Sequence, residues 1–159
     1  MPQEIERKYL VKGEYAPFIH QSDRITQGYI CRETGRTVRV RIRNGKGYLT
    51  IKGASADKGL SRYEWEQEIP VDEAKQLMLL CQPGIIDKTR HLIHYKGHLI
   101  EVDEFHGDNQ GLTIAEIELA HVDEMPLLPP FIGEEVTGDP RYYNSHLTRH
   151  PYTCWNKQD

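Results

Sequence analysis

The sequence of 159 residues predicts an α+β fold that is mostly β. We expect an eight-stranded antiparallel closed β-barrel, or tunnel, with a charged interior and a few helices outside. Two observations support this fold. About eight segments alternate between apolar and polar residues, the period of two that is typical of β-strands, and several are joined by short turns that favour antiparallel hairpins. Charged residues also recur on one face of strand after strand, some acidic and some basic.

The strands can be delimited one after another along the chain. A loop or short helix around Pro17 follows the first strand, and Asn44-Gly45 is a strong signal for a hairpin turn. Lys96-Gly97 marks a second hairpin. We expect strands at residues 3–11, 25–32, 36–43, 48–53, 62–69, 85–95, 98–105 and 112–120.

Two segments have the signals of helices. After Pro70 the pattern changes, and Asp72 has the chemistry of an N-cap for a helix over 72–81. Asp139-Pro140 combines N-cap and N1 chemistry, which predicts a last helix over 140–149. No linker or repeat divides the chain, so we expect one domain over 1–159.

Composition excludes several classes of protein. With 20 Lys+Arg against 24 Asp+Glu, the net charge of −4 argues against a nucleic-acid partner. The longest apolar run, 77–81, is too short to span a membrane, and the N-terminus has no apolar signal segment. Three widely spaced cysteines without a metal-binding motif indicate reduced thiols. We therefore expect a cytoplasmic protein.

The charged faces have two interpretations. For any single strand, charges that face water over an ordinary apolar core are the simpler one. Three arginines on one strand face, however, repel each other by about 2 kcal/mol per neighbouring pair at an effective dielectric constant near 20. An anionic ligand or facing carboxylates would offset this repulsion. The residues that share a face are Glu4/Glu6/Lys8, Arg39/Arg41/Arg43, Thr50/Lys52, Glu64/Glu66/Glu68, Lys88/Arg90, Glu101/Asp103 and Glu116/Glu118.

A barrel with these charges inside would have a specific chemical use. Carboxylates hold hard divalent cations such as Mg²⁺ through oxygen. Arginine and lysine bind phosphate oxygens, arginine in bidentate fashion. The two sets together fit a complex of a metal ion with a polyphosphate.

Several motifs resemble the CYTH superfamily, also called triphosphate tunnel metalloenzymes. Glu4-Ile5-Glu6-Arg7-Lys8 matches its ExExK signature. The resemblance covers about residues 3–148 and is closest to the short bacterial, inorganic tripolyphosphatase-like members. The further matching motifs are Gln27-Gly28-Tyr29, Arg39-x-Arg41, Thr50-x-Lys52, Gly59-Leu60-Ser61-Arg62, Glu64-x-Glu66, Lys88-x-Arg90, Glu101-x-Asp103, Glu116-x-Glu118, Gly133-Glu134-Glu135-Val136-Thr137 and Arg141-Tyr142-x-Asn144.

The resemblance implies an eight-stranded tunnel that binds a triphosphate with Mg²⁺ or Mn²⁺, with the C-terminal helix near one mouth. It assigns substrate binding to Lys8, Arg39, Arg41, Lys52, Lys88 and Arg90. It assigns the metal mainly to Glu4, Glu6, Glu116 and Glu118, with Glu64, Glu66, Glu101 and Asp103 on the acidic side. The candidates for positioning the attacking water are Lys8, Tyr29, Glu116 and Glu118, although Tyr29 also fits an ordinary packed strand tyrosine.

The implied reaction is hydrolysis of inorganic tripolyphosphate to diphosphate and phosphate by metal-activated water. A class IV adenylate cyclase, a thiamine triphosphatase and a polyphosphate-binding module without activity stay open as alternatives. An isologous homodimer is compatible with the sequence, although no residue argues for it directly. Outside the main pattern we expect Arg43 and Glu68 at the tunnel ends, and Arg7 and Arg62 at the surface or behind the site.

Overall fold

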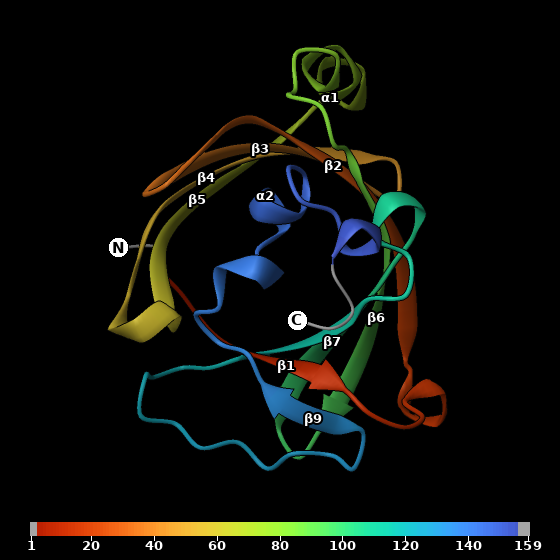
Figure 1. The fold of residues 1–159 in the computed structure, drawn as a ribbon, viewed down its shortest axis with the longest axis vertical. Helices are drawn as coiled ribbons and strands as arrows, with labels where there is room; N and C mark the ends of the chain where they lie inside the picture. The colour runs from red at the N-terminus through yellow and green to blue at the C-terminus, as the bar shows by residue number, and fades with distance from the viewer. Residues whose placement is uncertain (1–2, 156–159) are drawn as a thin grey trace.

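The computed structural model describes residues 3–155, and in this part of the chain nine strands form one antiparallel sheet. The sheet runs in the order β5-β4-β3-β2-β6-β7-β8-β1-β9, and a further pairing of β5 with β1 closes eight of the strands into a barrel (Figure 1). The predicted closed antiparallel barrel is confirmed. The strands are β1 (Gln3–Val11), β2 (Gln21–Glu33), β3 (Arg36–Arg43), β4 (Lys46–Ala56), β5 (Ser61–Ile69), β6 (Ile86–Tyr95), β7 (His98–Phe105), β8 (Thr113–Glu118) and β9 (Ile132–Glu135).

The hairpin turns form where the sequence predicts them. Asn44 and Gly45 both have positive φ, 51° and 78°, while Arg43 pairs with Lys46. Two positive φ values in a two-residue loop are what a type I′ turn requires, and the Asn-Gly sequence adopts them readily. The turn therefore fixes the register of β3 against β4, and with it the face on which the β3 arginines lie.

The ninth strand, β9, was not predicted. It has only four residues and follows the Pro-rich stretch 126–130, so no alternating pattern is long enough to reveal it. It pairs with the second half of β1, whose first half pairs with β5. β1 thus joins the closing seam of the barrel to an added outer strand.

Helix α1 (Val71–Met78) lies outside the barrel against β2, β3 and β4 (Figure 1). Ala74 packs over Gly47, where an added Cβ would lie 2.6 Å from the Ala74 Cβ. Two expectations for this helix are wrong. The N-cap is Pro70, with Asp72 inside the first turn, and the helix ends at Met78 rather than at residue 81.

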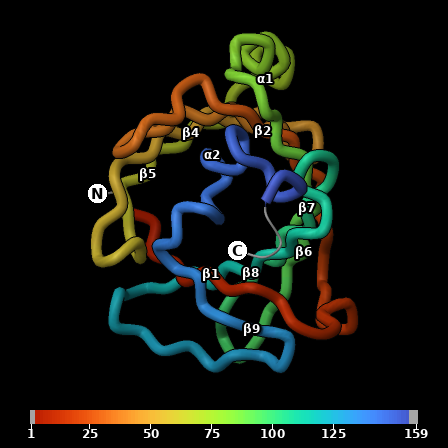
Figure 2. Tube along the Cα trace, in the orientation of Figure 1, coloured from red at the N-terminus to blue at the C-terminus, as the bar shows by residue number. Residues whose placement is uncertain are grey.

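The C-terminal segment enters the ring of strands rather than only covering it (Figures 1 and 2). The single helix predicted over 140–149 is wrong: the segment is a 3₁₀ turn (η4, Pro140–Tyr142) and a short helix α2 (Asn144–Leu147). They are separated by Tyr143, whose backbone is extended. The expected N-cap at Asp139 is confirmed, because its side chain accepts a hydrogen bond from the backbone N–H of Arg141. The remaining short elements are η1 (Ala16–Phe18), η2 (Asp57–Gly59), η3 (Gly107–Asn109) and η5 (Tyr152–Cys154).

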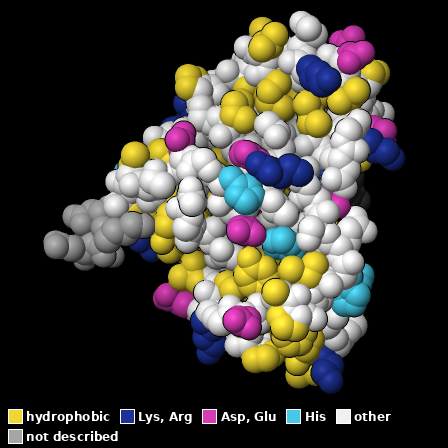
Figure 3. All heavy atoms as spheres, turned by 90° about the vertical axis from the view of Figure 1, so that its right-hand side faces the viewer, with side chains coloured by type: hydrophobic (Ala, Val, Ile, Leu, Met, Phe, Trp, Pro, Cys, Tyr) yellow, Lys and Arg dark blue, Asp and Glu magenta, His cyan; other side chains and the backbone are white. Residues whose placement is uncertain are grey.

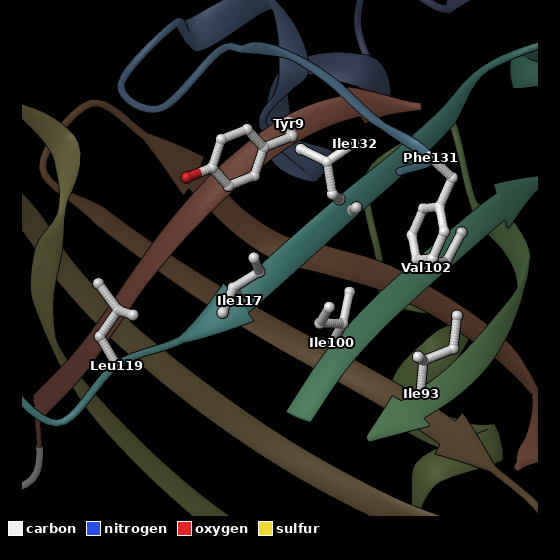
Figure 4. Packing of buried hydrophobic residues seen from close by; sticks show 9 residues of the cluster. Tyr9, Ile93, Ile100, Val102, Ile117, Leu119, Phe131 and Ile132 are labelled. Atoms are coloured by element: carbon white, nitrogen blue, oxygen red, sulfur yellow. The ribbon is translucent and has the colours of Figure 1, made fainter. Parts of the chain in front are cut away.

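Apolar residues form two separate cores. One lies on the outer face of β1, β7 and β8, under β9 and the loop that precedes it, and Figure 4 shows Ile100, Ile117 and Phe131 packed there. The other lies inside one end of the barrel. There Ile86 and Ile114, which share strand faces with the charged residues, pack with Tyr142 and Leu147 of the C-terminal segment. This second core closes one mouth of the barrel, as the resemblance implies.

The outer surface is mixed. On the face drawn in Figure 3, apolar side chains gather toward the two ends, while charged side chains are scattered over the whole face. The cysteines Cys31, Cys81 and Cys154 are all unpaired. Among residues 3–155, no helix is long and apolar enough to cross a membrane.

Candidate functional site

The barrel interior contains a polar cavity of about 270 Å³, which we call the tunnel cavity. It lies next to the second apolar core, where the C-terminal segment plugs one mouth of the barrel. Fourteen of the predicted site residues line it, and Asp103 is the one that does not. The fourteen are Glu4, Glu6, Lys8, Tyr29, Arg39, Arg41, Lys52, Glu64, Glu66, Lys88, Arg90, Glu101, Glu116 and Glu118. The charged strand faces therefore converge on an enclosed space, and the interpretation in which they face bulk water is wrong.

Strand pairing explains why acids gather on one wall. On neighbouring strands Glu6 pairs with Glu118, and Glu116 lies between Lys8 on β1 and Glu101 on β7. Directly opposed residues on the same face of a sheet lie close together. The carboxylates of β1, β7 and β8 are consequently packed side by side.

This crowding changes the ionisation of the carboxyl groups. Burial, together with the charges of Glu116 and Glu4, raises the pKa of Glu6 well above its ordinary value. Burial and the charges of Glu101, Glu4 and Glu116 likewise raise the pKa of Glu118. Both groups take up protons more readily than a free carboxyl group, because burial and the neighbouring negative charges both disfavour the ionised form.

Two acids on the same walls are held ionised by cations. Burial alone would raise the pKa of Glu4, but Lys52, whose Nζ lies 2.9 Å from Oε1, lowers it strongly. Burial also opposes ionisation of Glu116, and Lys8 and Arg90 outweigh it and lower the pKa of Glu116. The Lys8 Nζ lies 3.8 Å from Glu116 Oε1.

The donor set suits Mg²⁺ or Mn²⁺ in its chemistry. All of the acids that line the tunnel cavity offer oxygen, the ligand atom that hard divalent cations prefer. Within residues 3–155, no three carboxylate, imidazole or thiol groups already stand close enough to form a metal site. Glu6 and Glu118, which pair across β1 and β8, nevertheless mark a wall where a cation would relieve repulsion between like charges.

The opposite walls carry the cations. Arg41 donates from Nε to Gln27 Oε1 at 2.8 Å, and within the described residues it makes no ion pair with a carboxylate. Burial, with Arg39 and Arg90 nearby, lowers the pKa of Arg41 to about 9. Arg39 donates to Thr50 Oγ1 at 3.1 Å, while its buried Nε has no hydrogen-bond partner among residues 3–155. These guanidinium groups keep donors available for an anion.

Asp103 lies behind the cavity wall. Its side chain is 2% exposed, and its oxygens accept from Lys88 Nζ and from Arg90 Nε and Nη2, each at 2.8 Å. These two cations hold the pKa of Asp103 far below its ordinary value, although burial opposes them. Asp103 therefore fixes two cations of the site, and we leave it out of the proposed metal ligands.

The tunnel cavity also contains residues that the sequence analysis placed elsewhere or did not single out. Arg62 was expected at the surface or behind the site, yet it lines the cavity beside Glu4, with which it pairs across the strands. Arg62 is two residues from Glu64 and therefore lies on the same face of β5, a pattern that could have predicted its place in the cavity. Arg43 lines the cavity too, but its charge is matched by Asp23 Oδ2 at 2.6 Å. The additional lining residues are Thr37, Tyr143, Ser145 and Asn144, the last of which belongs to the Arg141-Tyr142-x-Asn144 motif but was assigned no role in the site.

Two peripheral predictions agree with the structure. Arg7 points away from the tunnel cavity and forms an ion pair with Glu135 at 3.0 Å. Glu68 is exposed and does not line the cavity.

Comparison with known proteins places this arrangement in a family. The chain matches the CYTH domain over residues 2–143. It is 47% identical over 153 residues to an inorganic triphosphatase of Acetivibrio thermocellus, covering 96% of this chain and 97% of the relative. It is 34% identical over 148 residues to an inorganic triphosphatase of Nitrosomonas europaea, covering 91% and 95%.

Solved structures agree. The crystal structure of an inorganic triphosphatase superposes with a TM-score of 0.66 at 31% identity, covering 91% of this chain and 97% of that one. With the family match over nearly its whole length, the chain belongs to the CYTH domain family.

Proposed function

We propose that this protein is a metal-dependent triphosphatase that hydrolyses inorganic tripolyphosphate to diphosphate and phosphate. The observation that carries the proposal is the tunnel cavity itself, where buried cations with free donors face a wall of crowded carboxylates. The names of the two relatives, both inorganic triphosphatases, support the same substrate.

The cationic walls would bind the phosphate chain. Arg41 and Arg39 have donors free to hold phosphate oxygens, and Arg90 and Lys88 are fixed from behind by Asp103. Lys52 lies where the cations meet the carboxylates, since its Nζ contacts both Glu4 and Glu64. Donors that are already in place stabilise charge on the equatorial oxygens and on the leaving diphosphate without reorganising.

The carboxylate wall would hold the metal ion. We assign this role mainly to Glu4, Glu6, Glu116 and Glu118, with Glu64, Glu66 and Glu101 as further oxygen donors around them. A bound Mg²⁺ or Mn²⁺ would neutralise phosphate charge and make a bound water more acidic.

Water positioning falls to residues at the border between the two walls. Lys8 lies there, between Glu116 and the Tyr142 carbonyl oxygen that accepts from its Nζ at 3.3 Å. Glu116 and Glu118 have oxygens that can accept a proton from water. Tyr29 also lines the tunnel cavity, and we include it among the candidates for positioning the attacking water.

The alternatives fit the lining less well. A cyclase needs a pocket for adenine, but nearly all the lining residues are charged or small and polar, with Tyr29 and Tyr143 as the aromatic ones. A module that only binds polyphosphate has no use for a crowded carboxylate wall. A thiamine triphosphatase must also hold a ring system beside the phosphates, and the mostly charged and small polar lining suits one less well.

Phosphate release tests the proposal. Wild-type protein should release phosphate from tripolyphosphate with Mg²⁺ or Mn²⁺ and should not do so in EDTA. With ATP, free phosphate without cyclic AMP separates hydrolase from cyclase. Arg41→Met should lose activity, whereas Arg24→Met, which removes an outer arginine paired with Asp87, is the matched control. Absence of phosphate release with either metal would refute the proposed function.

A further inference from the structure

Two uncharged amide side chains contact cations that line the tunnel cavity, and one of the two, Asn144, lines the cavity itself. Gln27 comes from β2 and has no exposed surface, and Asn144 is the first residue of α2 in the C-terminal plug. The Gln27 Nε2 lies 3.1 Å from Asn144 Oδ1. Residues from the barrel wall and from the plug thus meet directly beside the proposed phosphate site.

The orientation of both amides is fixed by their charged neighbours. Arg41 and Lys88 can only donate hydrogen bonds, so each requires an amide oxygen. Gln27 Oε1 accepts from Arg41 Nε at 2.8 Å, and Asn144 Oδ1 accepts from Lys88 Nζ at 2.9 Å. The Gln27 nitrogen is then left to donate to Asn144, which is the contact observed.

These contacts form one continuous chain of hydrogen bonds. It runs from Arg41 through Gln27 and Asn144 to Lys88, and then through Asp103 to Arg90. Three of the proposed phosphate-binding cations therefore belong to one network, although like charges in a buried space repel each other.

We infer that Gln27 and Asn144 are positioning residues that hold Arg41 and Lys88 in place for the phosphate chain, so that the C-terminal plug forms part of the substrate site. This inference rests on the proposed function. A carboxylate could also hold these cations, but it would cancel the charge that the phosphate needs. An amide oxygen orients a cation and leaves its charge available. Lys88 is also paired with the Asp103 carboxylate, so the argument applies most fully to Arg41, whose Nε has Gln27 as its one hydrogen-bond partner among residues 3–155.

Substitutions that remove the amides without changing their size test the inference. Gln27→Leu and Asn144→Leu should each raise the KM for tripolyphosphate by about 10- to 100-fold, with a smaller change in kcat. In the double variant the increase should be less than the product of the two single increases, because both act through one network. Gln27→Met and Asn144→Ala are second variants if the leucine proteins do not fold.

Asn109→Leu is the matched control. Asn109 is buried, whereas Asn144 is half-buried, and Asn109 also fixes the C-terminal segment, since its Oδ1 accepts from the Tyr152 backbone N–H at 2.8 Å. It does not line the tunnel cavity. If Asn144 only anchored the plug, Asn109→Leu and Asn144→Leu would lower the melting temperature by similar amounts, and neither would change the KM for tripolyphosphate.

A binding measurement without metal completes the test. In EDTA, tripolyphosphate should raise the melting temperature of the wild-type protein and of Asn109→Leu, but raise it much less in the Gln27 and Asn144 variants. If the wild type hydrolyses tripolyphosphate and folded variants keep KM within about twofold, the positioning role is overturned. If the wild type does not hydrolyse it, the proposed function fails on its own, and the EDTA measurement still decides whether the pair positions cations for the anion.

Discussion

Replacing Asp103 with asparagine distinguishes a structural counter-ion from a metal ligand. Within residues 3–155, Asp103 is the one acid that forms ion pairs with both Lys88 and Arg90, and the Lys88 side chain is 1% exposed. In Asp103→Asn an amide nitrogen takes the place of one acceptor oxygen. Two buried cations then lose their main compensating charge.

The size of the effect follows from this burial. Removing one partner of a buried ion pair costs about 3–5 kcal/mol, because an uncompensated charge remains inside. For a protein of this length each kcal/mol lowers the melting temperature by about 2–4 °C, so we expect a decrease of about 6–20 °C. Thermal unfolding followed by circular dichroism in EDTA measures it with the metal removed.

Glu101→Gln is the control for this measurement. Glu101 also contacts Arg90, at 3.3 Å, but its side chain is 21% exposed. An ion pair with this access to water contributes about 1 kcal/mol or less, so the melting temperature should change by only a few degrees. If metal-free Asp103→Asn melted like the wild type and lost only its response to Mg²⁺ or Mn²⁺, Asp103 would be a metal ligand and our interpretation would be refuted.

Three further predictions follow from the cavity and its surroundings. Glu118→Gln should lower Mn²⁺ affinity by about 10- to 100-fold in titration calorimetry while the melting temperature is kept, because Glu118 is crowded by like charges; unchanged affinity would remove it from the metal site. Burial, with Arg90 and Arg41 nearby, lowers the pKa of Lys88 to about 7, and a bound polyanion favours its charged form. Metal-free tripolyphosphate should therefore bind more weakly as pH rises above 7, by up to about tenfold per pH unit relative to Lys88→Met, and parallel pH profiles would contradict this. Gly59→Val should lower the free energy of unfolding in urea by about 1–3 kcal/mol, since φ is +92° and an added Cβ would lie 2.3 Å from Gly138 Cα; unchanged stability would show that the loop adapts.

The barrel and its charged lining were predictable from the sequence for a physical reason. Side chains of a strand alternate between its two faces, so the parity of Glu4, Glu6 and Lys8 survives whatever the strands pair with. Two-residue turns such as Asn44-Gly45 then fix neighbouring registers locally. Those two local rules suffice to bring most of the site together.

Other features of the site depend on how deeply a side chain is buried or on contacts with residues distant in the sequence. The alternation of a strand's side chains does not predict either. Asp103 has the same parity as Glu101, but only its contacts with Lys88 and Arg90 place it behind the wall. Gln27 and Asn144 belong to motifs that resemble the family, but they carry no charge, and nothing local predicts that they contact each other beside Arg41 and Lys88.

The C-terminal helix failed as a prediction for a similar reason. The capping residue Asp139 is local and was correct. The break at Tyr143 instead accompanies the packing of Tyr142 and Leu147 into the barrel end, which is a tertiary effect that outweighs helix propensity. β9 likewise exists because β1 offers it an edge.

The position of β1 has a consequence for the newly made chain. β1 precedes its partners β5, β8 and β9 in the chain, so it remains without its last partner until residue 135 has been synthesised. Contacts of such wide sequence separation form slowly, and an unpaired strand edge invites association with other chains. Premature termination before β8 would thus release an open sheet with an unpaired strand edge. Such a chain would need a chaperone to prevent its association with other chains.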